Sequence, residues 1–417
     1  MHKMTKRGFT RALVGAPLIA GIHALTRSSA TLAQSAGPGA LGGLPALDGT
    51  WLSDETTRET YARDYGLIVH ERPRAVLRPG SLEDVVRIVR FARRNQLPIA
   101  ARGHGHQPFG QAQVQDGIVI DMRSLATVHA ASEDRIEVDA GADWRAVLAV
   151  AVRNGRTPAV LPAYLGLTVG GTLSIGGLGI ATLRHGAQVD GVQQLQVVTG
   201  EGDVVRCSER EHADLFQAVL AGQGQCAIIA RAQLRSTAAK PMIREYALRY
   251  ADLAPLLADE AALLRDDRFD GVVAMIVPDA GSWSYTLIAS RAFAPAEPPD
   301  DVAMTAGLHA IAGSERRRDV EYAQYMEGVA ELHLTQSHAD LGLLVPGSAA
   351  PRFIASTLAR LRPDDLGAVA ALRVFSWPRA AFTRPLLRLP EQETVVYLAL
   401  LRAETTDAAT LARQLAG

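Results

Sequence analysis

AARGHGHQPFGQ, residues 100–111, sets two histidines two positions apart within a run of glycines. This pattern suits a metal site, a phosphate cradle or a covalent attachment. A second glycine-rich run, YLGLTVGGTLSIGGLG, occupies residues 164–179, and so many glycines predict a loop rather than a helix there. Glycine lets backbone amides approach one anion closely, so two separated loops of this kind predict a long diphosphate ligand held between strands.

Known phosphate and metal motifs narrow these possibilities. The sequence has no glycine-rich loop ending in GKS or GKT, which excludes a Walker-type NTPase. It also lacks a strand–GxGxxG–helix pattern followed by an acidic residue, which excludes a Rossmann dinucleotide site. His104 and His106 would lie on one face of a strand. No third ligand is evident near them, so we expect no metal.

Strand patterns and one clear helix surround the first loop. Ser81 and Asp84 form a capping box that opens a helix ending near Arg94, with apolar residues at helical spacing. Strands are expected at 99–101, 118–122, 135–144 and 226–233, and a hairpin at 192–208. This order predicts an α+β fold. After Pro241 the glycine-rich loops cease, and a strand at 244–250 and a helix at 251–265 indicate a second domain.

Composition excludes several classes of protein. The 417 residues hold 43 Lys and Arg against 44 Asp and Glu, so no basic field predicts nucleic-acid binding. Lys240 is the one lysine after the first ten residues, which leaves a single candidate for a Schiff base. The two cysteines, Cys207 and Cys226, form no CxxC pair and indicate neither a cysteine zinc site nor a disulfide framework.

The first residues predict an export signal over 1–35, followed by a linker over 36–50. A positively charged start, MHKMTKRGFTR, precedes an apolar run and the small residues SSATLAQSA. The apolar run is too short for a membrane span. Thr5-Lys6-Arg7-Gly8-Phe9-Thr10 resembles a twin-arginine signal, with an ordinary secretory signal as the alternative. We therefore expect export to the periplasm or the outside of the cell, and no membrane span.

Three long segments carry a resemblance to a known family. They are ARGHGHQPFGQAQVQDGIVIDM, YLGLTVGGTLSIGGLG followed by RHGAQVDGV, and LQVVTGEGDVVRCS continuing to AIIARAQL. Together they resemble the PCMH-type FAD-binding domain of the vanillyl-alcohol-oxidase class, and most of all the cytokinin dehydrogenases. The resemblance implies a two-subdomain FAD-binding fold over 51–240 and an α/β substrate domain over 241–390. Residues 391–417 would begin a C-terminal return segment that is apparently cut short.

The resemblance also implies which residues hold the cofactor. The histidine of the family's R-G-x-G-H motif, here His106, carries FAD covalently at the 8α carbon, while Arg102, Gly103, His104 and Gly105 wrap the diphosphate. Gln107 stands where serine is usual, and Gln111 matches. In and after the second run the matching residues are Thr168, Gly170, Gly171, Thr172, Ser174 and Ile229. Cys226 is expected to be a small buried hydrophobe, and His185 a structural residue or pocket wall.

The sequence departs from the family at positions that bear on the substrate. Ala163 occupies the place of the aspartate that accepts a proton in cytokinin dehydrogenases, and Val273 the place of a glutamate that reads the substrate. The proton acceptor is therefore unassigned, with Glu327 and Glu331 as candidates, or no base at all if the donor carbon is already activated.

These observations predict an exported FAD-dependent oxidoreductase that transfers a hydride from a small organic donor to covalent FAD. The resemblance implies oxidation of N6-substituted adenine side chains, with oxygen or a quinone as electron acceptor. An oxidase of sugars, alditols or other alcohols on the same fold is the alternative. A non-catalytic flavin-binding relic is the third possibility, because of Ala163 and the short C-terminus.

Overall fold

The computed structural model describes residues 43–279, 281–328, 335–361, 366 and 371–416. The expected export signal, residues 36–42 of the expected linker and Glu331 lie outside the described residues. The chain divides into two units, Met1–Pro45 and Ala46–Gly417. The helices and strands described here belong to the second unit.

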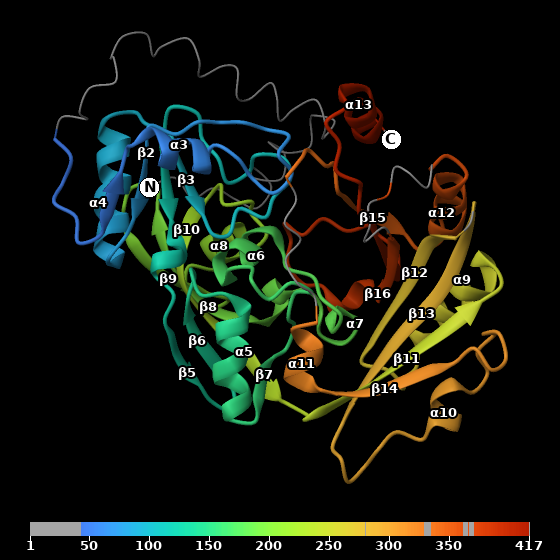
Figure 1. Ribbon diagram of the computed structural model, residues 1–417. Coiled ribbons are helices and arrows are strands. Elements are labelled where there is room, and N and C mark those ends of the chain that lie inside the picture. The colour runs from blue at the N-terminus through green and yellow to red at the C-terminus, as the bar shows by residue number, and fades with distance from the viewer. Residues whose placement is uncertain (1–42, 280, 329–334, 362–365, 367–370, 417) are drawn as a thin grey trace. The chain divides into compact units, whose positions relative to one another are not determined.

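The first sheet of this unit carries the start of the first glycine loop (Figure 1). Its strands run in the order β1 (Thr50–Leu52), β2 (Ala75–Arg78), β4 (Ile118–Asp121), β3 (Ile99–Arg102). Both β2 and β3 pair with β4 in parallel, and β1 is antiparallel. The helices α3 (Glu55–Tyr61) and α4 (Leu82–Arg94) belong to this part, and η1 (Met122–Ser124) follows β4. Ser81 caps α4 as predicted, because the Asp84 amide donates to the Ser81 hydroxyl at 3.3 Å. The Asp84 carboxylate accepts from the amides of Asp48, Gly49 and Gly80 instead of completing the capping box.

The second sheet is antiparallel and forms one wall of the candidate functional site. Within the described residues its order is β5 (Val128–Ala131), β6 (Arg135–Asp139), β10 (Ala227–Ala238), β8 (Val192–Thr199), β9 (Val204–Ser208), with β7 (Arg156–Pro158) also pairing with β10. The predicted hairpin is β8–β9. Helices of this part are α5 (Trp144–Arg153), α6 (Val169–Ile175), α7 (Thr182–His185), η2 (Gln188–Gly191) and α8 (Ala213–Val219).

The second glycine-rich run contradicts the expectation of a pure loop, because α6 forms within it. Tertiary contacts explain the difference. The Val169 amide donates to the Ala142 carbonyl at 2.9 Å and the Gly170 amide to the Ala140 carbonyl at 2.8 Å. Packing of α6 on β10 and β6 therefore outweighs the low helix propensity of two glycines in its first turn.

The third sheet dominates the C-terminal part. Its order is β14 (Arg316–Glu321), β11 (Met242–Tyr250), β13 (Ser282–Phe293), β12 (Gly271–Asp279), β16 (Leu372–Pro378), β17 (Thr394–Leu400), β15 (Leu341–Pro346). Its helices are α9 (Leu253–Leu263), α10 (Asp301–Thr305), α11 (Tyr322–Met326), α12 (Ala350–Leu358), η4 (Arg379–Ala381) and α13 (Ala408–Ala416). Strand β17 lies beyond residue 390, where we expected the substrate domain to end, and its antiparallel pairing with β15 and β16 is a long-range contact that local patterns do not reveal.

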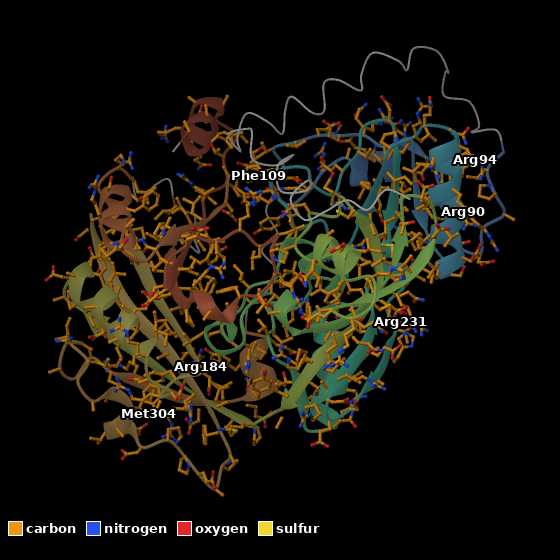
Figure 2. The ribbon with its side chains drawn as sticks, turned by 180° about the vertical axis from the view of Figure 1, so that it is seen from behind. Arg90, Arg94, Phe109, Arg184, Arg231 and Met304 are labelled. Carbon is orange, nitrogen blue, oxygen red and sulfur yellow. The ribbon has the colours of Figure 1, made fainter. Side chains whose placement is uncertain are left out.

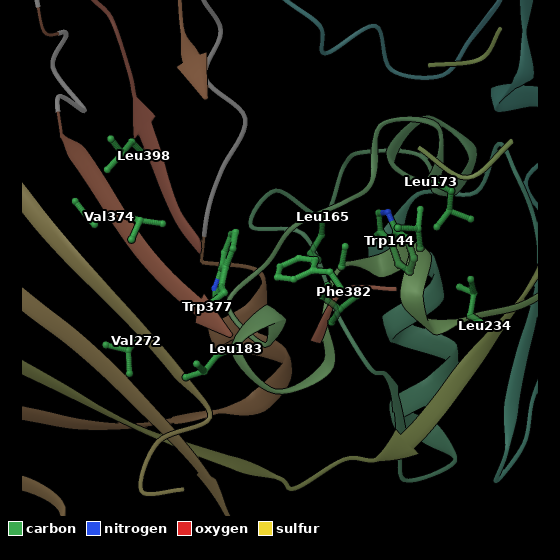
Figure 3. Packing of buried hydrophobic residues seen from close by; sticks show 14 of the residues in the cluster. Trp144, Leu165, Leu173, Leu183, Leu234, Val272, Val374, Trp377, Phe382 and Leu398 are labelled. Carbon is green, nitrogen blue, oxygen red and sulfur yellow. The ribbon is translucent and has the colours of Figure 1, made fainter. Parts of the chain in front are cut away.

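One hydrophobic cluster joins the second and third sheets. Figure 3 shows Trp377 of β16 beside Phe382, Leu165 and Leu183, which lead to Trp144 at the start of α5. Hydrogen bonds also connect these two parts of the protein. Arg184 of α7, labelled in Figure 2, donates to the carbonyls of Phe269 and Asp266 next to the third sheet. The buried side chain of Arg384 donates to the Val189 carbonyl at 2.9 Å.

Candidate functional site

A cavity of ≈ 480 Å³ lies between the first and second sheets. Its size is that of a typical small-molecule or cofactor site. Strands β3, β8 and β10 and helix α6 all contribute to its wall. Every residue predicted to bind the cofactor lines this single cavity: Arg102, Gly103, His104, Gly105, His106, Gln107, Gln111, Thr168, Gly170, Gly171, Thr172, Ser174 and Ile229.

The first glycine loop is held by its own arginine and by a buried aspartate. The Arg102 guanidinium donates to the Arg63 carbonyl at 2.7 Å and lies 5.4 Å from the centre of the Tyr61 ring. Burial lowers the pKa of Arg102 because the charged form loses water. Gly105 has φ of +74°, and a Cβ there would lie 2.3 Å from the Arg102 Nη2 atom. Arg102 therefore supports the loop with its side chain and leaves backbone to face a ligand.

Asp64 fixes the far end of the same loop, and sequence reasoning missed it. Its carboxylate accepts a hydrogen bond from the Gly110 amide. The side chain is only 5% exposed, and burial raises its pKa. The neighbouring Tyr65 amide donates to the Gly105 carbonyl at 3.0 Å. No motif marks these residues, because they approach the loop from some forty positions upstream.

His106 lies in an aromatic setting. The Tyr65 ring is 3.9 Å from the His106 ring, centre to centre, and the Tyr164 ring is 5.6 Å away. Tyr164 also lies 5.9 Å from His104. On its other side Tyr65 meets His338 edge-on at 4.6 Å. The imidazole of His106 is thus oriented by two tyrosines that the sequence alone did not single out.

The two glycine runs approach each other at Gly103 and Thr168. A Cβ on Gly103 would lie 1.9 Å from the Thr168 hydroxyl oxygen, and one on Gly171 would lie 2.9 Å from the same atom. Only glycine lets the backbone of the first run approach the Thr168 side chain so closely. The absence of a side chain at Gly103 therefore allows the two runs to lie against each other.

The hydroxyl groups of two residues predicted to bind the cofactor form hydrogen bonds within the protein itself. The Trp144 indole donates to the Thr172 hydroxyl oxygen at 3.0 Å. The Ser174 hydroxyl donates to the Gly170 carbonyl at 2.7 Å. These side chains hold α6 in place, so the contribution of this helix to a ligand comes mainly from its backbone.

The residues that line the cavity fit the requirements of FAD. Its glycine loops allow the close main-chain approach that a diphosphate requires. Within the described residues no group of three or more His, Cys, Asp or Glu side chains is arranged to hold a metal ion. The second wall adds Gln223, Gly224, Gln225 and Cys226, of which sequence reasoning had considered only the cysteine.

Comparison with known proteins gives the chain a family. A sequence model described as the FAD binding domain matches residues 73–208. An uncharacterized oxidoreductase, ORF5 in the fasciation locus of Rhodococcoides fascians, is 35% identical over 371 residues, covering 87% of this chain and 84% of that protein. The chain belongs to the PCMH-type FAD oxidoreductases.

Further relatives of this oxidoreductase share part of its length or only its fold. Cytokinin dehydrogenase 4 of Oryza sativa subsp. japonica is 38% identical over 243 residues, which is 55% of this chain and 46% of that protein. The chain thus spans about half the length of the cytokinin dehydrogenase it matches there. The solved structure of 6-hydroxy-D-nicotine oxidase from Arthrobacter nicotinovorans superposes with a TM-score of 0.70 at 21% identity, covering 90% of this chain and 86% of that one. This likeness confirms the PCMH-type FAD-binding fold.

Four further positions considered in the sequence of the oxidoreductase are not among the residues that line the cavity. Ala163 is exposed and precedes Tyr164 in the chain, and Glu327 is exposed directly after α11. Val273 is buried on β12. His185 ends α7, where burial and the charge of Arg235 lower its pKa. The structure brings none of these four into the group that lines the cavity.

Cys226 lines the cavity and is half-buried rather than fully buried as expected. Burial raises the pKa of its thiol, which disfavours the reactive thiolate. No helix among the described residues is long and apolar enough to cross a membrane.

Proposed function

We propose that this oxidoreductase carries FAD covalently through His106 and uses it to oxidise a small organic donor. The observation that carries the proposal is the convergence of both glycine loops and His106 on one cavity wall. The bond would replace one C–H of the flavin 8α methyl group and the N–H of the imidazole. The two electrons and two protons released pass to the electron acceptor, for which we propose oxygen or a quinone.

The residues of the chain would position the cofactor rather than react. Backbone at Arg102–Gly105 and at Gly170–Gly171 faces the diphosphate, with Thr168 setting the spacing between the loops. Tyr65 and Tyr164 fix the plane of the His106 ring. Bound FAD supplies a hydride acceptor. A covalent link keeps it in place outside the cell, where lost cofactor is not replaced.

The proton released by the donor has no acceptor at the family position, because Ala163 carries no titratable group. Glu327 and Glu331 remain the candidates for this role, and a donor with an activated carbon needs neither. We propose a donor related to N6-substituted adenines, on the strength of the similarity to cytokinin dehydrogenases. Turnover of an N6-alkenyl adenine against an alditol, with a dye as acceptor, tests this choice, and turnover of the alditol alone would reverse it.

His106→Ala tests the covalent link directly. The variant should lose all flavin on acid precipitation, because the attaching nitrogen is gone, while the wild-type pellet stays yellow. His104→Ala is the matched control, since His104 lines the same cavity and should keep the link. Mass spectrometry of the tryptic peptide that contains residue 106 provides a second readout. A wild-type holoprotein that yields only the bare peptide mass would overturn the proposal.

We also propose export through residues 1–35, with Lys6 and Arg7 as the twin-arginine pair. Substituting both with glutamine should retain the folded protein in the cytoplasm. Unchanged export of that variant would indicate an ordinary secretory route.

A further inference from the structure

One face of the third sheet carries aromatic side chains. The register pairs Phe375 with Tyr397 and Arg373 with Ala399, so Arg373, Phe375 and Trp377 alternate onto the same face as Tyr397. The Trp377 and Tyr397 rings stack at 5.6 Å with an angle of 11°, and Phe375 lies 5.9 Å from Tyr397. Helix α9 packs on the other face, where Tyr250 donates to its Asp259 at 2.7 Å. The aromatic face is therefore not the one that α9 covers.

Arg373 stands on this aromatic face without a fixed partner. The side chain is half-buried, and its Nε atom is buried with no hydrogen-bond partner in the part of the chain that the structure describes. Burial lowers the pKa of the guanidinium, with Tyr397 and Asp340 as the titratable groups that act on it. A buried N–H donor such as this Nε atom destabilises a fold unless a ligand or water accepts its hydrogen bond.

Asp340 is an acidic group that acts on Arg373. It lies just before β15 and accepts a hydrogen bond from the Arg402 amide at 2.7 Å, and the side chains of both Arg402 and Arg373 act on its carboxylate. His338, fully buried, places its Nε2 atom 3.9 Å from an Asp340 oxygen. These four residues form a charge cluster. An anion bound at Arg373 would accept the hydrogen bond for which its Nε atom has no partner among the described residues.

Ring contacts link this charge cluster to the predicted attachment site. His338 meets Tyr65 edge-on at 4.6 Å, and Tyr65 lies against His106 at 3.9 Å. The Ser337 hydroxyl donates to the Leu67 carbonyl at 2.7 Å, which ties the segment before β15 to the loop that carries Tyr65. The charge cluster therefore lies next to the Tyr65–His106 pair, on the side of Tyr65 that His338 contacts.

We propose that Arg373 binds the carboxylate of a planar aromatic donor whose ring lies against Phe375 and Tyr397. This inference names the class of donor and rests on the proposed FAD-dependent oxidation. Among N6-substituted adenines and other planar donors, it favours those that carry a carboxylate, because a neutral ring would leave the Arg373 charge without a partner.

Calorimetric titration of the purified holoprotein with matched probes tests the inference without turnover. The probes are 2-naphthoate and 2-naphthamide, which share a ring and differ in charge. Wild-type protein should bind the carboxylate at least about tenfold more tightly than the amide, because a charged hydrogen bond at a desolvated site contributes that much. Arg373→Gln should remove this preference and leave the amide affinity nearly unchanged. Phe375→Leu should weaken both probes alike.

Arg352→Gln is the matched control, because Arg352 is exposed on α12 away from the aromatic face. It should bind both probes as the wild type does. Equal affinity for the two probes in wild-type protein, no binding of either, or a preference that survives Arg373→Gln would each overturn the proposal. If Arg373→Gln does not fold, Arg373→Lys keeps the charge and should keep part of the preference. Because binding is read by heat, failure here is distinct from failure of the covalent link at His106.

Discussion

The wall of the FAD cavity and the aromatic face of the third sheet present different parts of the chain to a ligand. At the cavity, Gly103 and Gly171 bring main chain close to the Thr168 side chain, and the hydroxyls of Thr172 and Ser174 form hydrogen bonds that hold α6. At the sheet, long side chains such as Arg373 and Tyr397 form the surface. A site made of backbone is sensitive to added atoms, whereas a site made of side chains is sensitive to their removal.

The largest expected effect follows from adding one carbon to the backbone site. Gly103→Ala should reduce the flavin content of the purified protein by about tenfold or more, because its Cβ would lie 1.9 Å from the Thr168 hydroxyl oxygen. The ratio of flavin to protein absorbance measures this loss. Thr168→Ala in the same chain should restore part of the flavin. Gly191→Ala is the control, since its Cβ would meet only the Arg235 Cβ at 4.0 Å, and full loading of Gly103→Ala would refute the close-approach account.

A smaller effect is expected from a buried carboxylate that supports the backbone site. Asp84, fully buried on α4, accepts hydrogen bonds from the amides of Asp48, Gly49 and Gly80 at 2.7–2.9 Å. Asp84→Ala leaves these donors without a partner and should lower the free energy of unfolding by about 3 kcal/mol. Urea denaturation measures it. Exposed Glu83→Ala on the same helix should change stability by less than about 0.5 kcal/mol, and equal losses in the two variants would contradict the argument.

The smallest effect concerns a buried carboxyl behind the side-chain site. Glu260 of α9 is nearly fully buried and accepts one hydrogen bond, from the Ser376 amide of β16 at 3.0 Å. Burial raises its pKa to about 8. Between its usual pKa of about 4.3 and this value the folded protein keeps a proton that the unfolded chain releases. Stability contributed by Glu260 is therefore complete at the acid end of this window and is lost as pH rises through it.

Glu260→Gln should remove that pH dependence. Relative to the variant, the wild type should lose stability from pH 5 to pH 8, with a slope of at most about 1.4 kcal/mol per pH unit. Urea denaturation at both pH values measures the shift. A difference that stays constant across this range would show that Glu260 titrates normally.

Local patterns predicted the FAD half of the fold in detail. The helix from Ser81, the strand at 118–122 and the hairpin at 192–208 appear as α4, β4 and β8–β9. Each depends on a cap, an alternation or a turn within a few residues of itself. The prediction of a loop in the second glycine run was wrong over residues 169–175. Helix α6 forms there because it makes hydrogen bonds to Ala140 and Ala142, which follow a strand distant from it in the sequence.

The residues around His106 and Arg373 could not be predicted from local sequence patterns. Tyr65 and Asp64 reach the first glycine loop from about forty positions away in sequence and carry no motif. Arg373 reads as an ordinary polar position in an alternating strand until β17 and β15 are known to lie beside it. The predicted bases at Glu327 and Glu331 remain untested as donors or acceptors of a proton.

By itself the sequence determined the family, the two glycine loops and the histidine in the first of them, because close backbone approach needs glycine at fixed local spacing. The tertiary structure alone decided that both loops share one cavity and that Tyr65 and His338 connect His106 to the charge cluster. It also decided that the Arg373 Nε atom has no hydrogen-bond partner among the described residues. These facts depend on strand register and on contacts between distant segments. No short-range pattern encodes such contacts, since their energy is gained only when the whole sheet has formed.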